Sequence, residues 1–460
     1  MGNLLQSYVE KAVEFGEQLG LDVIIIRGLE KIHNQIRFSQ NKIDINKQWH
    51  TNVLEVFLVV DKNFIATGEF SPSNEAYIKD QIISLTEFAR KMSPSPFYQG
   101  VEESVTSNYP IIKGGYDSSI DSYREKAPEH VIACINAACE AGAKRVAGSY
   151  LFGETYSILK SSMGLYGQDQ ATFFNLTVRA FQDELDASGQ GLSCGRIPTV
   201  AEKDLLTAAT RAGTFSKLHR NAVQAKPGIY DVVMAPAVGA NLLGTIPSMA
   251  NPVAIMMGMS ALGDKMGSSL APEFVNVDDN GLFKDGLASE PFDIEGTPHQ
   301  NTPIIKNGVF INLIHNTSTS RIMGGQTTGN SNLTNFGIGS KFLAPTPTNR
   351  IFNNGDHSME EILQSENPTI FVSCNWYTRY TSRISTEYST IPRDAAFLVE
   401  NGELGVPIKN FRISDNLLRQ FENIDAMGKD RVQVKWWEVN VPTFIPSIRV
   451  KDCRITTATQ

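Results

Sequence analysis

The chain carries one long stretch without a charged residue, VVMAPAVGANLLGTIPSMANPVAIMMGMSALG, which runs from Val232 to Gly263. A membrane span needs roughly 20 consecutive apolar residues in an unbroken helix. Here breakers or polar residues recur every few positions, namely Pro236, Gly239, Asn241, Gly244, Pro247, Asn251 and Pro252. We therefore predict a buried core segment rather than a span, entered through a short buried strand at 229–234.

Composition limits the class of protein before any motif is considered. The chain has 460 residues, a net charge of -8 and 20% charged residues, as in a globular protein with a large core. The acidic balance and the scattered basic residues argue against nucleic-acid contact, and neither nucleic acid nor a membrane is expected as a partner. The five cysteines are odd in number and form no C-x-x-C pair, so we expect reduced thiols in a cytoplasmic protein.

The hydrophobic pattern predicts a helix followed by strands, twice over. The first series is a helix at 4–19, strand-like runs from Asp22, Asn34, Thr51 and Asn63, and a helix at 75–91. After a Pro-, Gly- and Ser-rich connection at 93–123 come a helix at 129–141 and strands within 144–181. The repeated order hints at an internal duplication.

These elements predict an α+β fold. The expected N-terminal domain covers 1–225, combines helices with an antiparallel sheet, and has possible subdomains at 1–95 and 125–225. The expected C-terminal domain covers 226–460 and is largely β, because beyond the uncharged stretch the pattern consists mostly of strands and loops.

Three shorter motifs carry local predictions. Thr199 to Glu202 has the spacing of a capping box that opens a helix. Asp278 and Asp279, in VNVDDNG, are interpreted as a structural turn, although paired carboxylates could also hold a cation. The Gly- and Asn-rich segment GGQTTGNSNLTNFGIGS, from Gly324, is expected to be a surface loop.

The histidines do not have the spacing of a helical zinc site. None of the seven forms H-x-x-x-H or H-E-x-x-H, which would place two imidazoles one turn apart on one face. His299 and His315 flank the turn EGTPHQ and could approach each other across a hairpin. We interpret them as turn and strand histidines, and a nonstandard metal site that uses them with an acidic residue is the alternative.

Several segments together resemble the TldD/PmbA family, whose members are also labelled modulators of DNA gyrase. They are RGLEKIHNQIRFSQNKID from Arg27, GIYDVVMAP from Gly228, GLASEPFDIEGTPHQNTPIIKNGVF from Gly286 and RDAAFLVENGELGVPIKNFRISDN from Arg393. The resemblance covers essentially the whole chain in the right order. It implies a dimeric peptidase that acts on unfolded or flexible peptides. In that assembly TldD-like chains bind a catalytic zinc through H-E-x-x-x-H and a late Cys, whereas TldE-like (PmbA) chains lack these ligands.

The same resemblance implies that this chain has lost the metal site. Counting from Pro236 places the first His at Gly244, the Glu at Thr245 and the second His at Met249. The stretch in which the late Cys belongs contains none, and Cys453, which follows it, does not match the motif. We therefore expect no catalytic residue and no cofactor in this chain, with zinc carried by a TldD-like partner.

The leading hypothesis is a non-catalytic, TldE/PmbA-like subunit paired with a TldD-like metallopeptidase subunit. The segment at 295–302 and the following strand are the candidate contacts for a peptide, which could add to a strand edge. The substrate-binding candidates are Glu295, Gly296, Thr297, Pro298, His299 and Asn301. A self-sufficient metallopeptidase with a nonstandard metal site and a homodimeric peptide-binding scaffold remain as alternatives.

Overall fold

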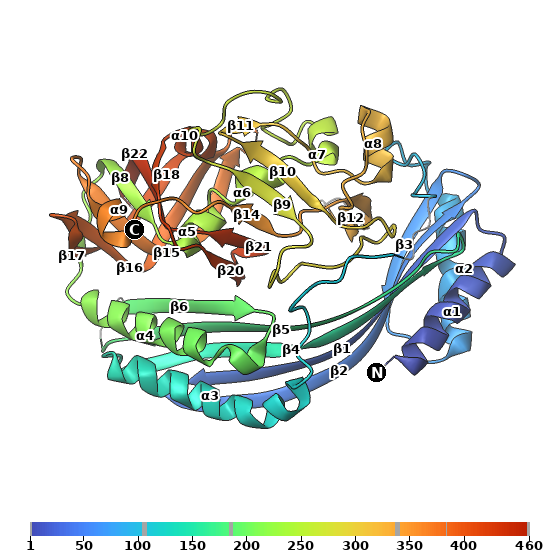
Figure 1. Cartoon of the computed structure of the whole chain (residues 1–460), viewed down its shortest axis with the longest axis horizontal. Coiled ribbons are helices and arrows are strands. Elements are labelled where there is room, and N and C mark those ends of the chain that lie inside the picture. Colours follow the sequence, from blue (N-terminus) through green and yellow to red (C-terminus); the bar gives the residue numbers. More distant parts are fainter. Residues whose placement is uncertain (1, 104–107, 184–186, 336–340, 383, 458–460) are drawn as a thin grey trace.

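A long, curved antiparallel sheet forms the base of the molecule (Figure 1). The computed structural model describes residues 2–103, 108–183, 187–335, 341–382 and 384–457. Within these ranges the sheet has six strands in the order β3-β2-β1-β4-β5-β6. Their bounds are β1 (Val23–Ser39), β2 (Lys42–Val60), β3 (Phe64–Phe70), β4 (Arg145–Ser161), β5 (Tyr166–Phe181) and β6 (Ser188–Gly195).

Helices cover the outer face of this sheet. They are α1 (Asn3–Gln18), α2 (Glu75–Lys91), α3 (Ile120–Glu140), α4 (Glu202–Leu218) and the 3₁₀ turn η1 (Pro198–Val200). α1 and α2 pack on one end of the sheet, and α3 and α4 on the other (Figure 1). Close packing of α1 on β1 explains why residue 28 is a glycine, because a Cβ there would lie 2.5 Å from Val9 Cγ2 of α1.

The order helix, three antiparallel strands, helix occurs twice, and β1 and β4 pair where the two units meet. This arrangement is the one that the expected duplication requires, while the domain and subdomain boundaries stay predictions. A hairpin loop at 61–63 joins β2 and β3. The separate runs predicted from Asp22 and Asn34 are one continuous strand, because β1 pairs along its whole length with β2.

Two local predictions in this half are wrong. α3 begins at Ile120 rather than at 129, and Pro128 lies inside it. The helix continues through the proline because its buried face, from Ile120 to Ala138, outweighs the lost hydrogen bond. The capping box at Thr199 does not form, since Ala201 is the N-cap of α4 and the Thr199 hydroxyl donates to Asp117 Oδ2 at 2.6 Å.

Within the described ranges the C-terminal half is built from two larger sheets and the two-stranded sheet of β12 and β13. Its strands are β7 (Val223–Gln224), β8 (Gly228–Met234), β9 (Val277–Asn280), β10 (Asn301–Lys306), β11 (Val309–Phe310), β12 (Ser331–Thr334), β13 (Phe342–Pro345), β14 (Arg350–Phe352), β15 (Thr369–Ser382), β16 (Glu387–Glu400), β17 (Glu403–Lys409), β18 (Phe411–Asn416), β19 (Ile424–Met427), β20 (Val432–Trp436), β21 (Val439–Ile445) and β22 (Ile448–Thr457). Its short helices are α5 (Pro236–Asn241), α6 (Thr245–Ser248), α7 (Pro252–Met256), α8 (Thr317–Met323), α9 (Met359–Leu363) and α10 (Leu417–Glu422).

One of these sheets closes on itself. The described strands run in the order β15-β8-β22-β18-β16, and β15 also pairs with β16, so that they form a closed barrel. The other larger sheet has the order β11-β10-β9-β14-β21-β20. The predicted α+β class is confirmed, with a helix-plus-antiparallel-sheet half and a largely β half.

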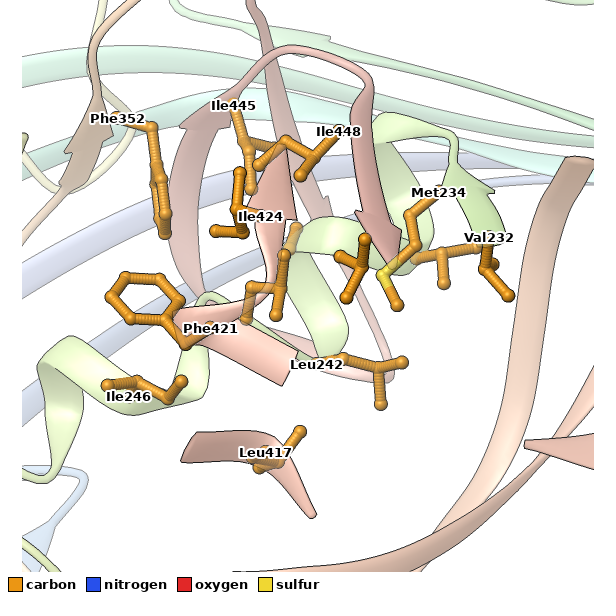
Figure 2. Close-up of a cluster of buried hydrophobic side chains, with 14 of the residues drawn as sticks. Val232, Met234, Leu242, Ile246, Phe352, Leu417, Phe421, Ile424, Ile445 and Ile448 are labelled. Carbon is orange, nitrogen blue, oxygen red and sulfur yellow. The ribbon is translucent and has the colours of Figure 1, made fainter. Parts of the chain in front are cut away.

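The uncharged stretch lies in the largest core cluster, as predicted. After β8 it continues as α5, α6 and α7, and its side chains meet those of the C-terminal strands (Figure 2). Val232, Leu242 and Ile246 each have 0% of their surface exposed. Burial is interrupted after α7, where Met259 is 39% exposed, and resumes at Ala261 and Leu262. None of the helices in the described ranges is long and apolar enough to cross a membrane.

A buried ion pair joins the long sheet to the C-terminal half. Arg179 of β5 donates through Nη2 to Asp394 Oδ1 of β16 at 2.6 Å, and Ser188 Oγ donates to the same oxygen at 2.7 Å. The guanidinium lies over the rings of Phe181 and Trp376, with centroids at 4.8 and 4.5 Å. Strand alternation makes this possible, because alternate residues of β5 face the C-terminal half while their neighbours face α3 and α4.

We expect Arg179→Met to destabilise the protein by about 3 kcal/mol or more, because it leaves the fully buried Asp394 carboxylate without its cation. The free energy of unfolding, followed by tryptophan fluorescence in urea, measures the effect. Lys11→Met breaks an exposed pair with Glu14 and is the control, with a much smaller expected loss because water and salt screen the pair. Equal losses in the two variants would contradict the structural role of the buried pair.

Candidate functional site

The positions at which the family resemblance places metal ligands lie at the junction of α5 and α6. Gly244 is buried, and a Cβ there would lie 2.4 Å from the carbonyl oxygen of Ala240. The Thr245 hydroxyl donates to the Leu242 carbonyl at 2.6 Å. Met249 is half-buried and packs against the core of the barrel half. The backbone therefore leaves no room for an imidazole at Gly244 without a local shift.

These residues do not fit a zinc ion. Gly244 has no side chain, the Thr245 hydroxyl is used by its own backbone, and a Met thioether is a poor zinc ligand. The surrounding segment from Val238 to Ile246 packs as core. Within the described ranges, moreover, no group of three or more His, Cys, Asp or Glu side chains is placed to hold a metal ion.

Cys453 does not substitute for the late cysteine. It is fully buried in β22, and its sulfur accepts a hydrogen bond from Gln420 Nε2 at 3.2 Å. Burial and the nearby Asp415 carboxylate raise the pKa of the Cys453 thiol far above its usual range. The thiolate that a metal or a nucleophilic reaction requires is therefore disfavoured.

The substrate-binding candidates lie in and beside a tight turn that Asp293 holds in place. Asp293 Oδ1 accepts the backbone N–H groups of Glu295 and Thr297 at 2.9 and 3.0 Å, and Oδ2 accepts that of Ser331 at 2.8 Å. Gly296 has φ 75°, and a Cβ there would lie 2.2 Å from Leu165 Cδ1. Both the backbone conformation and the contact therefore require glycine.

Glu295 points inward rather than toward solvent. Its Oε2 accepts the Thr317 N–H at 3.1 Å and the Thr317 hydroxyl at 2.6 Å. Its Oε1 is buried and has no hydrogen-bond partner. Burial raises the pKa of Glu295 to about 7, and burial together with the Glu295 charge also raises the pKa of Asp293, against the effect of its three N–H donors. The two neighbouring carboxyl groups therefore hold protons more readily than exposed ones.

The two histidines flank one segment but do not form a metal site. A Cβ on Gly329 would lie 3.2 Å from His299 Cα, and the His315 backbone N–H donates to Thr328 Oγ1 at 2.6 Å. Burial lowers the pKa of His299 to about 4 and also lowers that of His315. Both rings are therefore neutral near pH 7, and His315 Nδ1 lies 3.2 Å from Thr319 Oγ1.

The structure separates the candidate residues into two groups. Glu295, Gly296 and His299 are buried, whereas Thr297 and Pro298 are half-buried and Asn301 is exposed. Asn301 begins β10, whose outer side is paired with β11 at Ile305 and Lys306. Contact between these residues and a peptide stays a prediction, and the exposed group is the part that a ligand could touch directly.

Two loop predictions near the turn need correction. Asp278 and Asp279 lie in strand β9 rather than in a turn, because Asp279 is buried and accepts hydrogen bonds from Asn330 Nδ2 at 2.6 Å and Thr348 N–H at 2.7 Å. Burial raises the pKa of Asp279 to about 6. Asn330 and Ser331, in the predicted surface loop from Gly324, are buried as well, and residues 336–340 of that loop lie outside the described residues.

Sequence reasoning missed the residues that surround Glu295. Four buried polar atoms without a hydrogen-bond partner belong to the turn and the segments in contact with it, namely Glu295 Oε1, Thr297 Oγ1, Asn316 Nδ2 and Ser331 Oγ. Asn316 and Thr319 form a capping box at the start of α8, a spacing that the sequence does contain. The approach of Ser331 to the turn, by contrast, follows from tertiary packing alone.

Comparison with known proteins gives the class of this fold and site. A family model described as the PmbA/TldA metallopeptidase C-terminal domain matches residues 227–457. The chain therefore belongs to the PmbA/TldD family of metallopeptidase-related proteins.

Curated relatives carry protease names. Metalloprotease PmbA of Escherichia coli O157:H7 is 28% identical over 201 residues, which cover 43% of this chain and 41% of that protein. A Metalloprotease of Methanothermobacter thermautotrophicus is 24% identical over 264 residues, covering 55% of this chain and 56% of that protein. The chain spans about half the length of the curated relatives it matches.

Solved structures share the fold along the whole chain. TldE from Thermococcus kodakarensis has a TM-score of 0.79 and 16% identity, covering 98% of this chain and 100% of that one. A putative modulator of DNA gyrase from Thermotoga maritima has a TM-score of 0.80 and 20% identity with the same coverage. At these identities the likeness is one of fold.

We expect Gly244→Ala to destabilise the protein by about 1–3 kcal/mol, because the added methyl group meets the Ala240 carbonyl oxygen. Gly263→Ala is the matched control, since the nearest atom to its Cβ would lie at 3.7 Å. Thermal unfolding of the two variants measures the difference. A Gly244 variant as stable as the control would show that this junction has room for a side chain after all.

The raised pKa of Glu295 gives a pH dependence of stability. The folded state holds the proton up to about pH 7, whereas the unfolded chain releases it near its ordinary pKa of 4.5. The contribution is fully present below about pH 4.5 and is lost as the pH rises through about 7. We expect wild type to lose on the order of 3 kcal/mol relative to Glu295→Gln over this window.

Urea unfolding of both proteins at a series of pH values measures this difference, which includes the effect of Glu295 on Asp293, while the contributions of groups that do not interact with Glu295 cancel. Glu17→Gln, on the exposed surface of α1, should follow the wild-type profile. Parallel profiles for wild type and Glu295→Gln would mean that the Glu295 carboxyl titrates alike in the folded and unfolded states.

Proposed function

We propose that this chain is the non-catalytic, TldE/PmbA-like subunit of a zinc peptidase that acts on unfolded or flexible peptides. The observation that carries the proposal is the packing at the junction of α5 and α6. At the positions where the resemblance places two His ligands and a catalytic Glu, the chain has Gly244, Met249 and Thr245. A Cβ at Gly244 would already collide with backbone, and Thr245 bonds the carbonyl of Leu242.

The chemistry of peptide hydrolysis gives the reason. A metallopeptidase needs a metal with an open coordination position and a general base beside it. A threonine hydroxyl cannot serve as that base near neutral pH, and glycine supplies no ligand. This chain lacks all of the side chains that the resemblance assigns to the zinc site. We therefore place the zinc in a TldD-like partner and assign peptide binding and subunit assembly to this chain.

Peptide contact is the second part of the proposal. The half-buried Thr297 and Pro298 and the exposed Asn301 lie at the start of β10, and Asp293 and Gly296 fix the shape of the turn behind them. An extended peptide that lies along this strand would gain backbone hydrogen bonds with little dependence on its sequence. The buried Glu295 and His299 then act by holding the turn.

The proposal predicts that the native form is a dimer of unequal chains with zinc in the other chain. Native mass spectrometry of this chain, captured from its own cells, measures both the composition and the metal content of the intact complex. Capture of the Gly263→Ala variant, which adds a single methyl group at an exposed position, is the control for the pull-down.

Other results of the same measurement would replace the proposal. Equal chains with one zinc each would establish a self-sufficient peptidase with a nonstandard metal site. Equal chains without metal would establish a homodimeric peptide-binding scaffold.

A further inference from the structure

A cavity of about 470 Å³ lies between the inner face of the long sheet and the C-terminal half. Its floor comes from alternate residues of β1, β4 and β5, and its roof from residues 287–290, Asn332 and Lys435. The floor combines small or hydroxyl-bearing residues, such as Thr155, Ser157 and Ala171, with the larger apolar side chains of Leu29, Leu151 and Phe173. This cavity is separate from the junction of α5 and α6 and from the turn at 293–297.

One end of the cavity carries excess negative charge. Asp169 of β5 is half-buried, with the Gln170 N–H as its hydrogen-bond donor and Glu290 as a neighbouring carboxylate. Burial and the Glu290 charge raise the pKa of Asp169 to about 7. The nearby Arg196 guanidinium is already engaged, because it donates to the carbonyl groups of Gly286 and Ser289. A ligand cation would relieve the repulsion between Asp169 and Glu290.

The other end carries an unpaired cation. The Lys435 carbonyl accepts a hydrogen bond from Asn175 Nδ2 of β5 at 2.8 Å, which fixes this residue over the far end of the floor. Its ammonium donates to the Asn440 carbonyl and, among the described residues, has no carboxylate partner. Burial lowers the pKa of Lys435. A ligand carboxylate would supply the missing counter-charge.

The remaining charged groups of the lining do not alter this polarity. Arg27 is neutralised by Glu55, with Nε and Oε2 2.6 Å apart, and Arg27 also donates to Asn332. Lys31, opposite Thr155 in the sheet, lies at the level of Ala171, between the two ends and nearer to Asp169 than to Asn175, so that Lys435 is the cation of the far end. The cavity thus has an acidic end and a basic end.

The spacing of the two ends sets the size of the ligand. Asp169 and Asn175 are six residues apart on β5, which corresponds to about 20 Å at roughly 3.3 Å per residue. An extended chain of about five residues spans a similar length.

We propose that this cavity binds a short extended peptide by both of its free ends, with the amino terminus between Asp169 and Glu290 and the carboxylate at Lys435. The choice of a peptide among ligands with this charge pattern rests on the proposed function. The chain would then hold small peptides, the size of cleavage products, without any metal of its own.

Isothermal titration of the full-length chain with pentaalanine tests the proposal. We expect saturable binding that weakens about tenfold or more when the peptide is N-acetylated, and similarly when it is C-amidated. No binding at millimolar peptide, or equal binding of the free and the doubly blocked peptide, would overturn the proposal.

Two variants test which end of the peptide lies at which end of the cavity. Asp169→Asn should weaken binding of the free peptide but leave the affinity for the N-acetylated peptide unchanged. Lys435→Met should weaken binding of the free peptide but leave the affinity for the amidated peptide unchanged. Asp264→Asn and Lys306→Met, both at exposed positions, are the matched controls. A loss that is the same for every peptide would overturn the assignment of ends.

Thermal unfolding of each variant separates a binding defect from misfolding. The titration uses this chain alone, so its result is independent of whether a metal-bearing partner exists. Failure of the partner experiment with successful titration removes the proposed subunit role and keeps the peptide site, and the reverse result removes only the site.

Discussion

The arrangement of the two halves depends on the buried pair between Arg179 and Asp394. Its carboxylate is completely shielded from water, so the guanidinium has to remain in place once the halves meet. β5 carries Arg179 on the same face as Asp169 and Asn175. The ion pair of Arg179 therefore sets the distance between the sheet and the C-terminal half above all three residues. The Asn175 bond to Lys435 and the Arg196 bonds to Gly286 and Ser289 repeat this constraint along the sheet. The cavity thus results from the contacts that hold the long sheet to the C-terminal half. Its charges come from described residues to which these contacts supply no counter-ion.

Sequence reasoning succeeded where the signal was local and uniform. The stretch from Val232 predicts a core segment, because its lack of charge disfavours an exposed position and its prolines disfavour a membrane span. The order of helix and then strands follows from the hydrophobic periodicity. Sequence reasoning failed where tertiary packing decides. Pro128 lies inside α3 because the buried face of that helix outweighs one lost bond, and Asp279 is a strand residue because Asn330 and Thr348, far along the chain, supply its donors. Asp169 and Glu290 could not be paired from sequence, since nothing local marks two carboxylates from different halves as neighbours. The metal-site positions came from resemblance, and the blocked Cβ at Gly244 became visible only in three dimensions.

The junction of α5 and α6 and the turn around Glu295 differ in how many of their buried polar atoms lack a hydrogen-bond partner. At the junction of α5 and α6 the Thr245 hydroxyl bonds the Leu242 carbonyl, Ser248 Oγ alone is buried without a partner among the described residues, and most other contacts are apolar. Around Glu295 several buried polar atoms have no partner, and a carboxyl group keeps its proton to an unusually high pH. Unsatisfied buried polar groups cost free energy, and a chain retains them where they have a use or where a water molecule completes them. The turn is therefore the part of the C-terminal half in which the proposed peptide contact and stability are most closely linked.

Closure of the barrel sets the order in which segments of the chain can fold during translation. β8 pairs with β15 and with β22, and β22 is the last strand. The long sheet is complete by residue 195 and consists of neighbouring antiparallel strands, so it can form while synthesis continues. The uncharged stretch after β8 leaves the ribosome early, but its core is completed only when β22 arrives. During that interval it is an exposed apolar segment, so the period of greatest risk of aggregation lies within translation, and a stop codon shortly before β22 would leave that risk permanent.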